Sequence, residues 1–178
     1  PEHAGSISRV LAIPAKRRQR RTDITYLTDP EVTALLNAPD QGTPAGRRDH
    51  ALLQVAVTTG LRVSELTGLR VGDVHLGTGA HVLAHGKGRK DRSTPLDHAS
   101  VTVLRDLLGD TMTNRDRYVF TTRTGTRMSR DAVAVRLTLH ATTAALTCPT
   151  LTGKNLTPHV LRHTAAMPRW RPSSASPW

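Results

Sequence analysis

Residues 47–69 read RRDHALLQVAVTTGLRVSELTGL, and this stretch decides how the chain folds. Its segment 51–57 is strongly apolar, which predicts a buried helix, and Gly60 is the residue type that ends helices in a left-handed conformation. A second helix follows at once, so Arg62 lies in a tight turn with Glu65 three residues further on. A guanidinium held in such a turn suits bidentate phosphate binding. Taken alone, the Arg–Glu pair is more typical of a surface ion pair.

Helix-start signals continue on both sides of this stretch. Thr28 and Glu31 match a capping box around Pro30, so the ordered body is expected to begin near Ile24 with a helix over TDPEVTALLN. Capping residues also precede two later helices, at Asp97 and Thr157, and a further helix is expected to begin at Ser129.

The stretch HVLAHGKGRKDRSTPL changes character. Val82–Ala84 and Arg92–Leu96 predict two strands, with the glycine-rich basic residues 86–91 as their turn. The expected fold class is therefore α+β: mainly α, with a small antiparallel β-hairpin or sheet.

Composition points to a nucleic-acid partner. The chain has 178 residues and a formal net charge of +11, a balance that favours binding to nucleic acid. The simpler interpretation of this charge is a generic basic surface. A single cysteine excludes a disulfide framework, and the nine histidines lack the paired spacing of a metal site, so we expect no metal and no cofactor. No apolar run reaches membrane-spanning length, which favours a reducing, soluble compartment and no membrane partner.

Two segments concentrate cations that could contact DNA. In the hairpin, Lys87 stands between two glycines, and a lysine there could reach into a groove or donate a proton to a leaving oxygen. For both segments a solvated basic surface is the plain alternative. The candidate DNA contacts are Lys16, Arg17, Arg18, Arg20 and Arg21 near the N-terminus, and Arg89, Lys90 and Arg92 beside Lys87.

The last expected helix, in LTPHVLRHTAA, carries His159 and Arg162 three residues apart on one face. A helix start that lies beside an imidazole and a guanidinium favours an anion. His163 is expected to point elsewhere and to be a buried, satisfied histidine. A lone His–Arg pair on a helix is otherwise usually structural.

Taken in order, TGLRVSEL, GKGRKDRSTPL and LTPHVLRHTAA resemble the catalytic domain of the tyrosine recombinases, the phage-integrase family of DNA breaking–rejoining enzymes, from about residue 24 to Ala166. The resemblance implies double-stranded DNA as partner, self-association on DNA, and a place in the bacterial cytosol at the nucleoid. It also implies strand cleavage through a 3′-phosphotyrosine, without a metal.

The resemblance assigns roles residue by residue. Arg62 and Arg162 would bind the non-bridging oxygens of the cleaved phosphate, as donors aimed at developing charge do. Glu65 would support Arg62, Lys87 would protonate the leaving 5′ oxygen, and His159 would take part in proton transfer.

The family's tyrosine nucleophile should follow Arg162 by a few dozen residues, but none of the 16 residues after Arg162 (178 − 162) is a tyrosine. Tyr26 and Tyr118 lie in the wrong places for that role. We therefore expect a basic linker over 1–23, left from an N-terminal core-binding domain, an incomplete catalytic domain over 24–167 that lacks its last helices, and a divergent, disordered tail over 168–178. Pro168 cannot continue the helix, so a frameshift or truncation is the expected origin of that tail.

On this view the chain belongs to DNA recombination or integration but is inactive alone. The alternative is a non-catalytic DNA-binding module or regulator derived from a recombinase. A basic RNA-binding protein would explain the charge but not the three ordered motifs.

Overall fold

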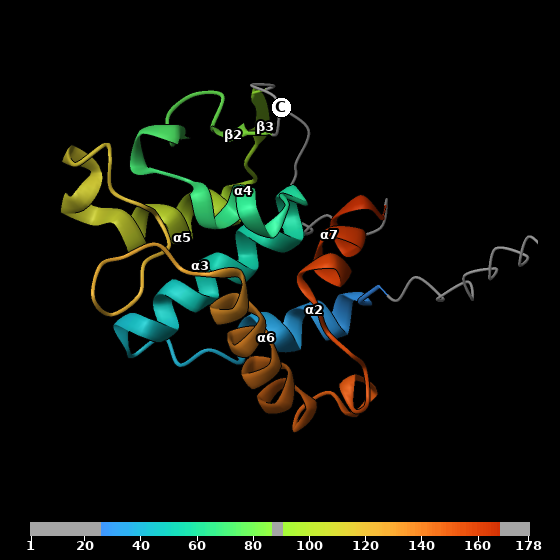
Figure 1. The fold of residues 1–178 in the computed structure, drawn as a ribbon. Coiled ribbons are helices and arrows are strands. Elements are labelled where there is room, and N and C mark those ends of the chain that lie inside the picture. Colours follow the sequence, from blue (N-terminus) through green and yellow to red (C-terminus); the bar gives the residue numbers. More distant parts are fainter. Residues whose placement is uncertain (1–25, 87–90, 168–178) are drawn as a thin grey trace, which may run out of the picture.

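The computed structural model describes residues 26–86 and 91–167, which form a helical body with one small sheet (Figure 1). The expected linker 1–23 and tail 168–178 lie outside these residues. The helices are α2 (Asp29–Asn37), α3 (Pro44–Thr59), α4 (Val63–Gly68), α5 (His98–Leu108), α6 (Arg130–Ala145) and α7 (Pro158–Ala166). Short 3₁₀ turns are η1 (Val71–Asp73), η2 (Gly109–Thr113) and η3 (Pro149–Leu151), and the strands are β1 (Val74–His75), β2 (His81–His85) and β3 (Asp91–Pro95).

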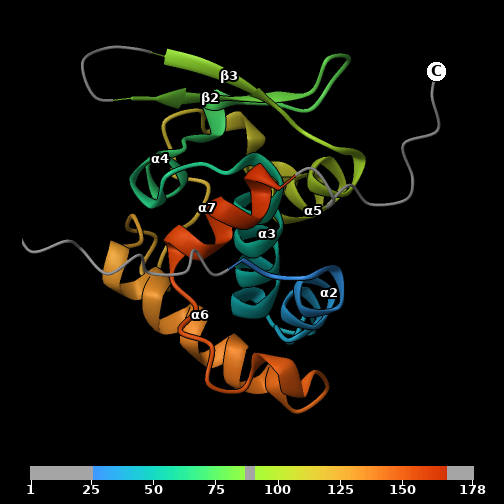
Figure 2. The same ribbon diagram turned by 90° about the vertical axis from the view of Figure 1, so that its right-hand side faces the viewer.

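Helix α3 is the centre of the fold. It packs against α2, α4, α5 and α7, and the views in Figures 1 and 2 agree in placing it between them. Residues 51–57 are all buried along it, which confirms the expected buried helix. Because segment 51–57 is buried on every side, other helices must surround this part of α3.

The predicted helix starts are confirmed. Thr28 and Glu31 form the capping box of α2, and the side chains of Asp97, Ser129 and Thr157 accept backbone N–H bonds at the starts of α5, α6 and α7. These caps satisfy N–H groups that have no partner inside a helix. They also fix where α6 and α7 begin.

The sheet confirms the predicted hairpin and adds one strand. The order is β1-β2-β3, all antiparallel, and His85 lies opposite Asp91 at the end of the β2–β3 pair where the chain turns. Strand β1 has only two residues, too few to show an alternating pattern. Figure 2 shows the hairpin at one end of the molecule, above α4.

One buried charge cluster joins α3 to α6. Asp49 is 2% exposed, and its carboxylate accepts hydrogen bonds from Arg48 (2.6 Å) and His140 (2.9 Å). Burial alone would raise the pKa of Asp49, but the hydrogen bonds from His140 and Arg48 outweigh it and lower that pKa. The ionised carboxylate therefore fastens the two helices together. Within the described parts of the chain, no helix is long and apolar enough to cross a membrane.

Candidate active site

The turn that carries Arg62 is held by a left-handed glycine. Gly60 has φ 60° and ψ 28° and ends α3, and Arg62 is the N-cap of α4 two residues later. A Cβ at Gly60 would lie 3.1 Å from the Cβ of Ala165 on α7, so the turn and α7 are in close contact. The Arg62 side chain is 62% exposed. The backbone is thus fixed while the guanidinium faces outward.

Glu65 is buried beneath this turn and accepts hydrogen bonds from both the backbone and the side chain of Arg62. Its side chain is 4% exposed, and its two oxygens bind the Arg62 backbone N–H (2.8 Å) and Nη1 (2.8 Å). Burial raises the pKa of Glu65, but the hydrogen bonds from Arg62 and the charges of Arg92 and Arg62 lower it below its ordinary value of 4.5. The carboxylate is therefore ionised at neutral pH and orients Arg62.

Arg92 also binds this carboxylate, which the sequence did not indicate. Its Nη2 lies 2.9 Å from Oε2 of Glu65, so a residue of β3 is tied to α4 across 27 positions of sequence. We expected Arg92 as a DNA contact; that role stays a prediction, and the structure gives Arg92 a second task. It docks the hairpin onto the helix that bears Arg62.

Arg162 reaches the same turn from α7. Its Nη1 donates a 2.6 Å hydrogen bond to the carbonyl oxygen of Gly60, two residues before Arg62. Helix α7 packs along α3, and Figure 2 shows it in front of α3 with its end near α4. Residues 100 positions apart in the sequence therefore meet at one turn.

His159 lies one turn before Arg162 on α7 and is exposed, with His163 beside it. The two Nε2 atoms are 2.7 Å apart and the rings meet edge to face. The expectation that His163 is buried and points elsewhere was wrong: it is partly exposed and contacts His159. The reason is the i, i+4 spacing, which places two residues on one helix face.

Several candidates lie outside the described residues. These are Lys87, Arg89 and Lys90 in the hairpin turn and Lys16, Arg17, Arg18, Arg20 and Arg21 near the N-terminus. Their predicted roles stay predictions. Lys87 belongs to the residues 86–90 that connect His85 to Asp91, its partner on the neighbouring strand.

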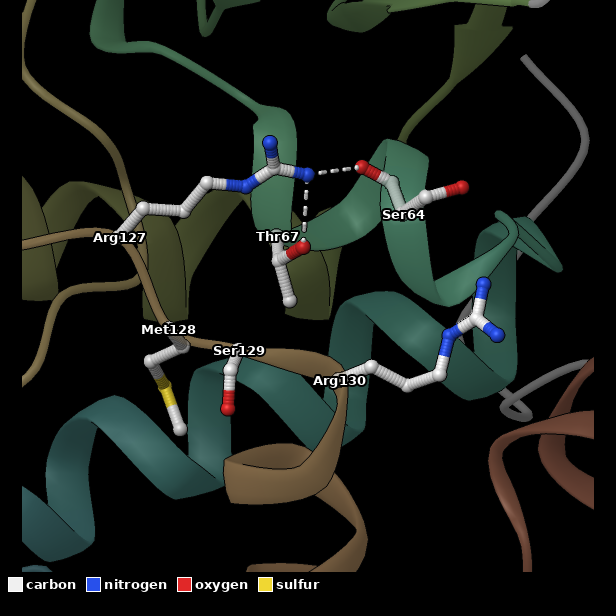
Figure 3. A pocket seen from close by; sticks show the side chains of 6 residues that line it. All are labelled: Ser64, Thr67, Arg127, Met128, Ser129 and Arg130. Atoms are coloured by element: carbon white, nitrogen blue, oxygen red, sulfur yellow. Dashed lines mark hydrogen bonds between the residues drawn. The ribbon is translucent and has the colours of Figure 1, made fainter.

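A polar cavity of about 360 Å³ lies beside α4, between α4 and the start of α6 (Figure 3). Arg127 points into α4, where its Nη2 donates to the Ser64 carbonyl (2.9 Å) and the Thr67 hydroxyl (3.1 Å). Arg130 extends from the start of α6 without a contact to the other labelled residues. Neither arginine is among the site residues predicted from the sequence, although the run RTGTRMSR is rich in cations.

The two tyrosines lie in different surroundings. Tyr118 is half-buried, and the guanidiniums of Arg70 and Arg127 lie 5.1 and 5.8 Å from its ring centre. Tyr26 is 46% exposed and precedes Leu27, whose N–H donates to Thr164 of α7 (3.0 Å).

Comparisons with known proteins identify the family and the fold. A family model described as the phage integrase family matches residues 25–168. The protein y4rC of Sinorhizobium fredii is 50% identical over 167 residues, which cover 94% of this chain and 50% of y4rC. Tyrosine recombinase XerD of Pseudomonas aeruginosa is 38% identical over 145 residues, 79% of this chain and 46% of XerD. The structure of the XerH site-specific recombinase bound to difH substrate matches with a TM-score of 0.66 and 22% identity, over 80% of this chain and 42% of XerH. The chain spans about half the length of the curated relatives it matches.

Proposed function

The chain belongs to the phage integrase family of tyrosine recombinases, and we propose that it forms the part of a DNA strand-exchange enzyme that grips the phosphate to be cleaved. The proposed catalytic domain spans residues 24–167. Its substrate is double-stranded DNA, to which a net charge of +11 attracts it. Self-association on DNA and a place at the bacterial nucleoid belong to the same proposal.

The observation that carries this function is the hydrogen bond from Arg162 to the Gly60 carbonyl. It fastens the helix that bears His159 and Arg162 to the turn that bears Arg62. Two guanidiniums at one turn can bind the two non-bridging oxygens of one phosphodiester. The negative charge on those oxygens grows in the transition state, so donors already in place lower the barrier without reorganising.

The remaining residues take supporting roles in this proposal. Glu65 positions Arg62 by binding both its backbone and its side chain. His159 exchanges a proton at the phosphate, and His163, whose Nε2 lies 2.7 Å from that of His159, orients its ring. Lys87, which follows β2 in the chain, donates a proton to the leaving 5′ oxygen.

The nucleophile comes from outside these 178 residues. Tyr118 is covered by two guanidiniums, and Tyr26 precedes Arg62 in the chain, whereas the family's nucleophile follows the His-x-x-Arg motif. The chain alone is therefore proposed to bind DNA without cutting it. XerH, of the same fold, forms a pre-cleavage complex with its difH substrate, and the Tn1549 transposon integrase, also of this fold, forms a complex with circular intermediate DNA, which supports DNA as the ligand.

Two measurements on the whole chain test this proposal. Binding to a fluorescently labelled 30-base-pair duplex should weaken steeply between 50 and 200 mM salt, because each phosphate neutralised adds about −0.9 to the log–log slope. A nearly flat salt dependence would exclude electrostatic DNA binding. A pool of nicked duplexes of random sequence should give no covalent adduct on denaturing gels. An adduct that disappears in Tyr26→Phe would show that the chain carries its own nucleophile.

A non-catalytic regulator is the second candidate, favoured by the net charge of +11 together with the candidate phosphate-binding residues Arg62 and Arg162. It predicts that the chain competes with an intact recombinase for its site. The enzyme-part proposal predicts instead that adding the missing nucleophile in a longer chain restores cleavage that depends on Arg162.

A further inference from the structure

His85, the last residue of β2, is held between two carboxylates. Its Nδ1 lies 2.9 Å from Oδ1 of Asp91, its partner across the strands, and its Nε2 lies 3.0 Å from Oδ1 of Asp73 at the end of η1. The imidazole therefore joins β2 to β3 on one side and to η1 on the other. The motifs that identify the family do not include it.

The contacts fix the protonation state of this ring. An ionised carboxylate can only accept hydrogen bonds, so each contact requires a hydrogen on the histidine nitrogen. A neutral imidazole carries one N–H and would set a lone pair against one of the two carboxylates. Both bonds form together only when the ring is an imidazolium. The hydrogen bonds to Asp73 and then Asp91 accordingly raise the pKa of His85 above its ordinary value of 6.5, against a small opposing effect of burial.

Asp73 is a firm anchor for this contact. Its side chain is 14% exposed, and its second oxygen accepts the Arg70 backbone N–H at 2.8 Å. Among the residues that the structure describes, Glu65 of α4 lines the same cavity of about 40 Å³ as Asp73 and His85, and it is already paired with Arg62 and Arg92. Every acidic neighbour among the described residues therefore favours the charged ring.

We propose that His85 is a positioning residue whose imidazolium joins β2 to β3 and clamps the hairpin onto η1, so that the hairpin is held more tightly in weakly acidic than in alkaline solution. The clamp lies two residues before Lys87, a span of about 7 Å of chain at most. Its loosening therefore leaves the end of β2, just before the turn, less firmly fixed. The importance of that turn rests on the proposed function; the clamp itself does not.

The sign of the effect follows from the raised pKa. The clamp contributes fully below about pH 6.5, where the unfolded histidine is also charged, and is lost as the pH rises through the higher value of the folded protein. The ring is 57% exposed, so each pair is screened by water. Exposed pairs contribute on the order of a two- to fivefold change in an equilibrium.

The first test is an NMR titration of the histidine ring signals in the whole chain. The His85 pKa should exceed 6.5, and Asp73→Asn and Asp91→Asn should each lower it. Asp116→Asn, which removes an exposed carboxylate paired with Arg70, serves as the control and should leave it unchanged. A His85 pKa at or below 6.5, or one that ignores both substitutions, would overturn the proposal.

The second test measures hydrogen-exchange protection of the β2–β3 amides at pH 6 and pH 8.5. Protection should fall about two- to fivefold from pH 6 to pH 8.5 in the native chain and be low at both in His85→Asn. His85→Arg keeps a permanent charge and should keep protection at both. His81→Asn, on the same strand but stacked on His75, is the matched control. Equal protection in the native chain and His85→Asn at pH 6 would contradict the clamp. Failure of the chain to bind DNA would defeat the proposed function while leaving both of these readouts unaffected.

Discussion

Replacing Glu65 removes the group on which two arginines and the start of α4 converge. Its carboxylate accepts the Arg62 N–H, the Arg62 Nη1 and the Arg92 Nη2, all within 2.9 Å. Loss of the helix cap costs about 1 kcal/mol. The two guanidinium pairs would contribute more if buried, but the arginine side chains are 62% and 43% exposed, so each counts for about 0.5 kcal/mol. Glu65→Ala should therefore lower the free energy of unfolding by about 2 kcal/mol at pH 7.

Urea unfolding at pH 7 and pH 4 measures this change, and Glu65→Gln isolates its charge. Because the pKa of Glu65 is lowered in the folded chain, its contribution is present above pH 4.5 and lost as the pH falls through the lower folded value. The difference between native and Glu65→Gln should therefore shrink on acidification. Asp116→Ala, at a surface pair, should cost under about 0.5 kcal/mol. If Glu65→Ala costs no more than this control, Glu65 does not organise the turn.

Two further predictions concern the frame of the site. Asp49→Ala leaves Arg48 and His140 without their buried partner and should cost about 3–5 kcal/mol of unfolding free energy in urea, a loss that is smaller at low pH because the pKa of Asp49 is lowered. A cost under 1 kcal/mol would mean that water reaches the cluster. Gly60→Ala forces a side chain into the left-handed region, 3.1 Å from the Cβ of Ala165, and should cost about 1–3 kcal/mol while weakening duplex binding. Unchanged binding in a folded Gly60→Ala chain would separate the turn from the DNA site.

Local signals in the sequence were sufficient to predict where the helices begin and to which family the chain belongs. Thr28, Asp97, Ser129 and Thr157 cap helices through contacts a few residues away, so their pattern is visible in one stretch of chain. The α+β class and the family are confirmed for the same reason, since the motifs are short and ordered.

Contacts between distant residues could not be predicted. The bonds from Arg92 to Glu65 and from Arg162 to Gly60 join positions 27 and 102 residues apart, and no spacing rule covers such pairs. The contact between His159 and His163 follows from the i, i+4 spacing, which places both rings on one helix face, so the sequence was sufficient to predict it. Strand β1 was too short to detect.

The central claim is that Arg62 and Arg162 act on one phosphate, and the salt dependence of duplex binding tests it most directly. The log–log slope counts phosphates neutralised, not arginines present. Arg62→Gln combined with Arg162→Gln should therefore flatten the slope by about 0.9, one phosphate, while Arg47→Gln, about 20 Å away along α3 from Gly60, serves as the control for a distant arginine. A loss of about 1.8 in the double variant, the sum of two separate contacts, would show that the two guanidiniums bind different phosphates and would contradict the account.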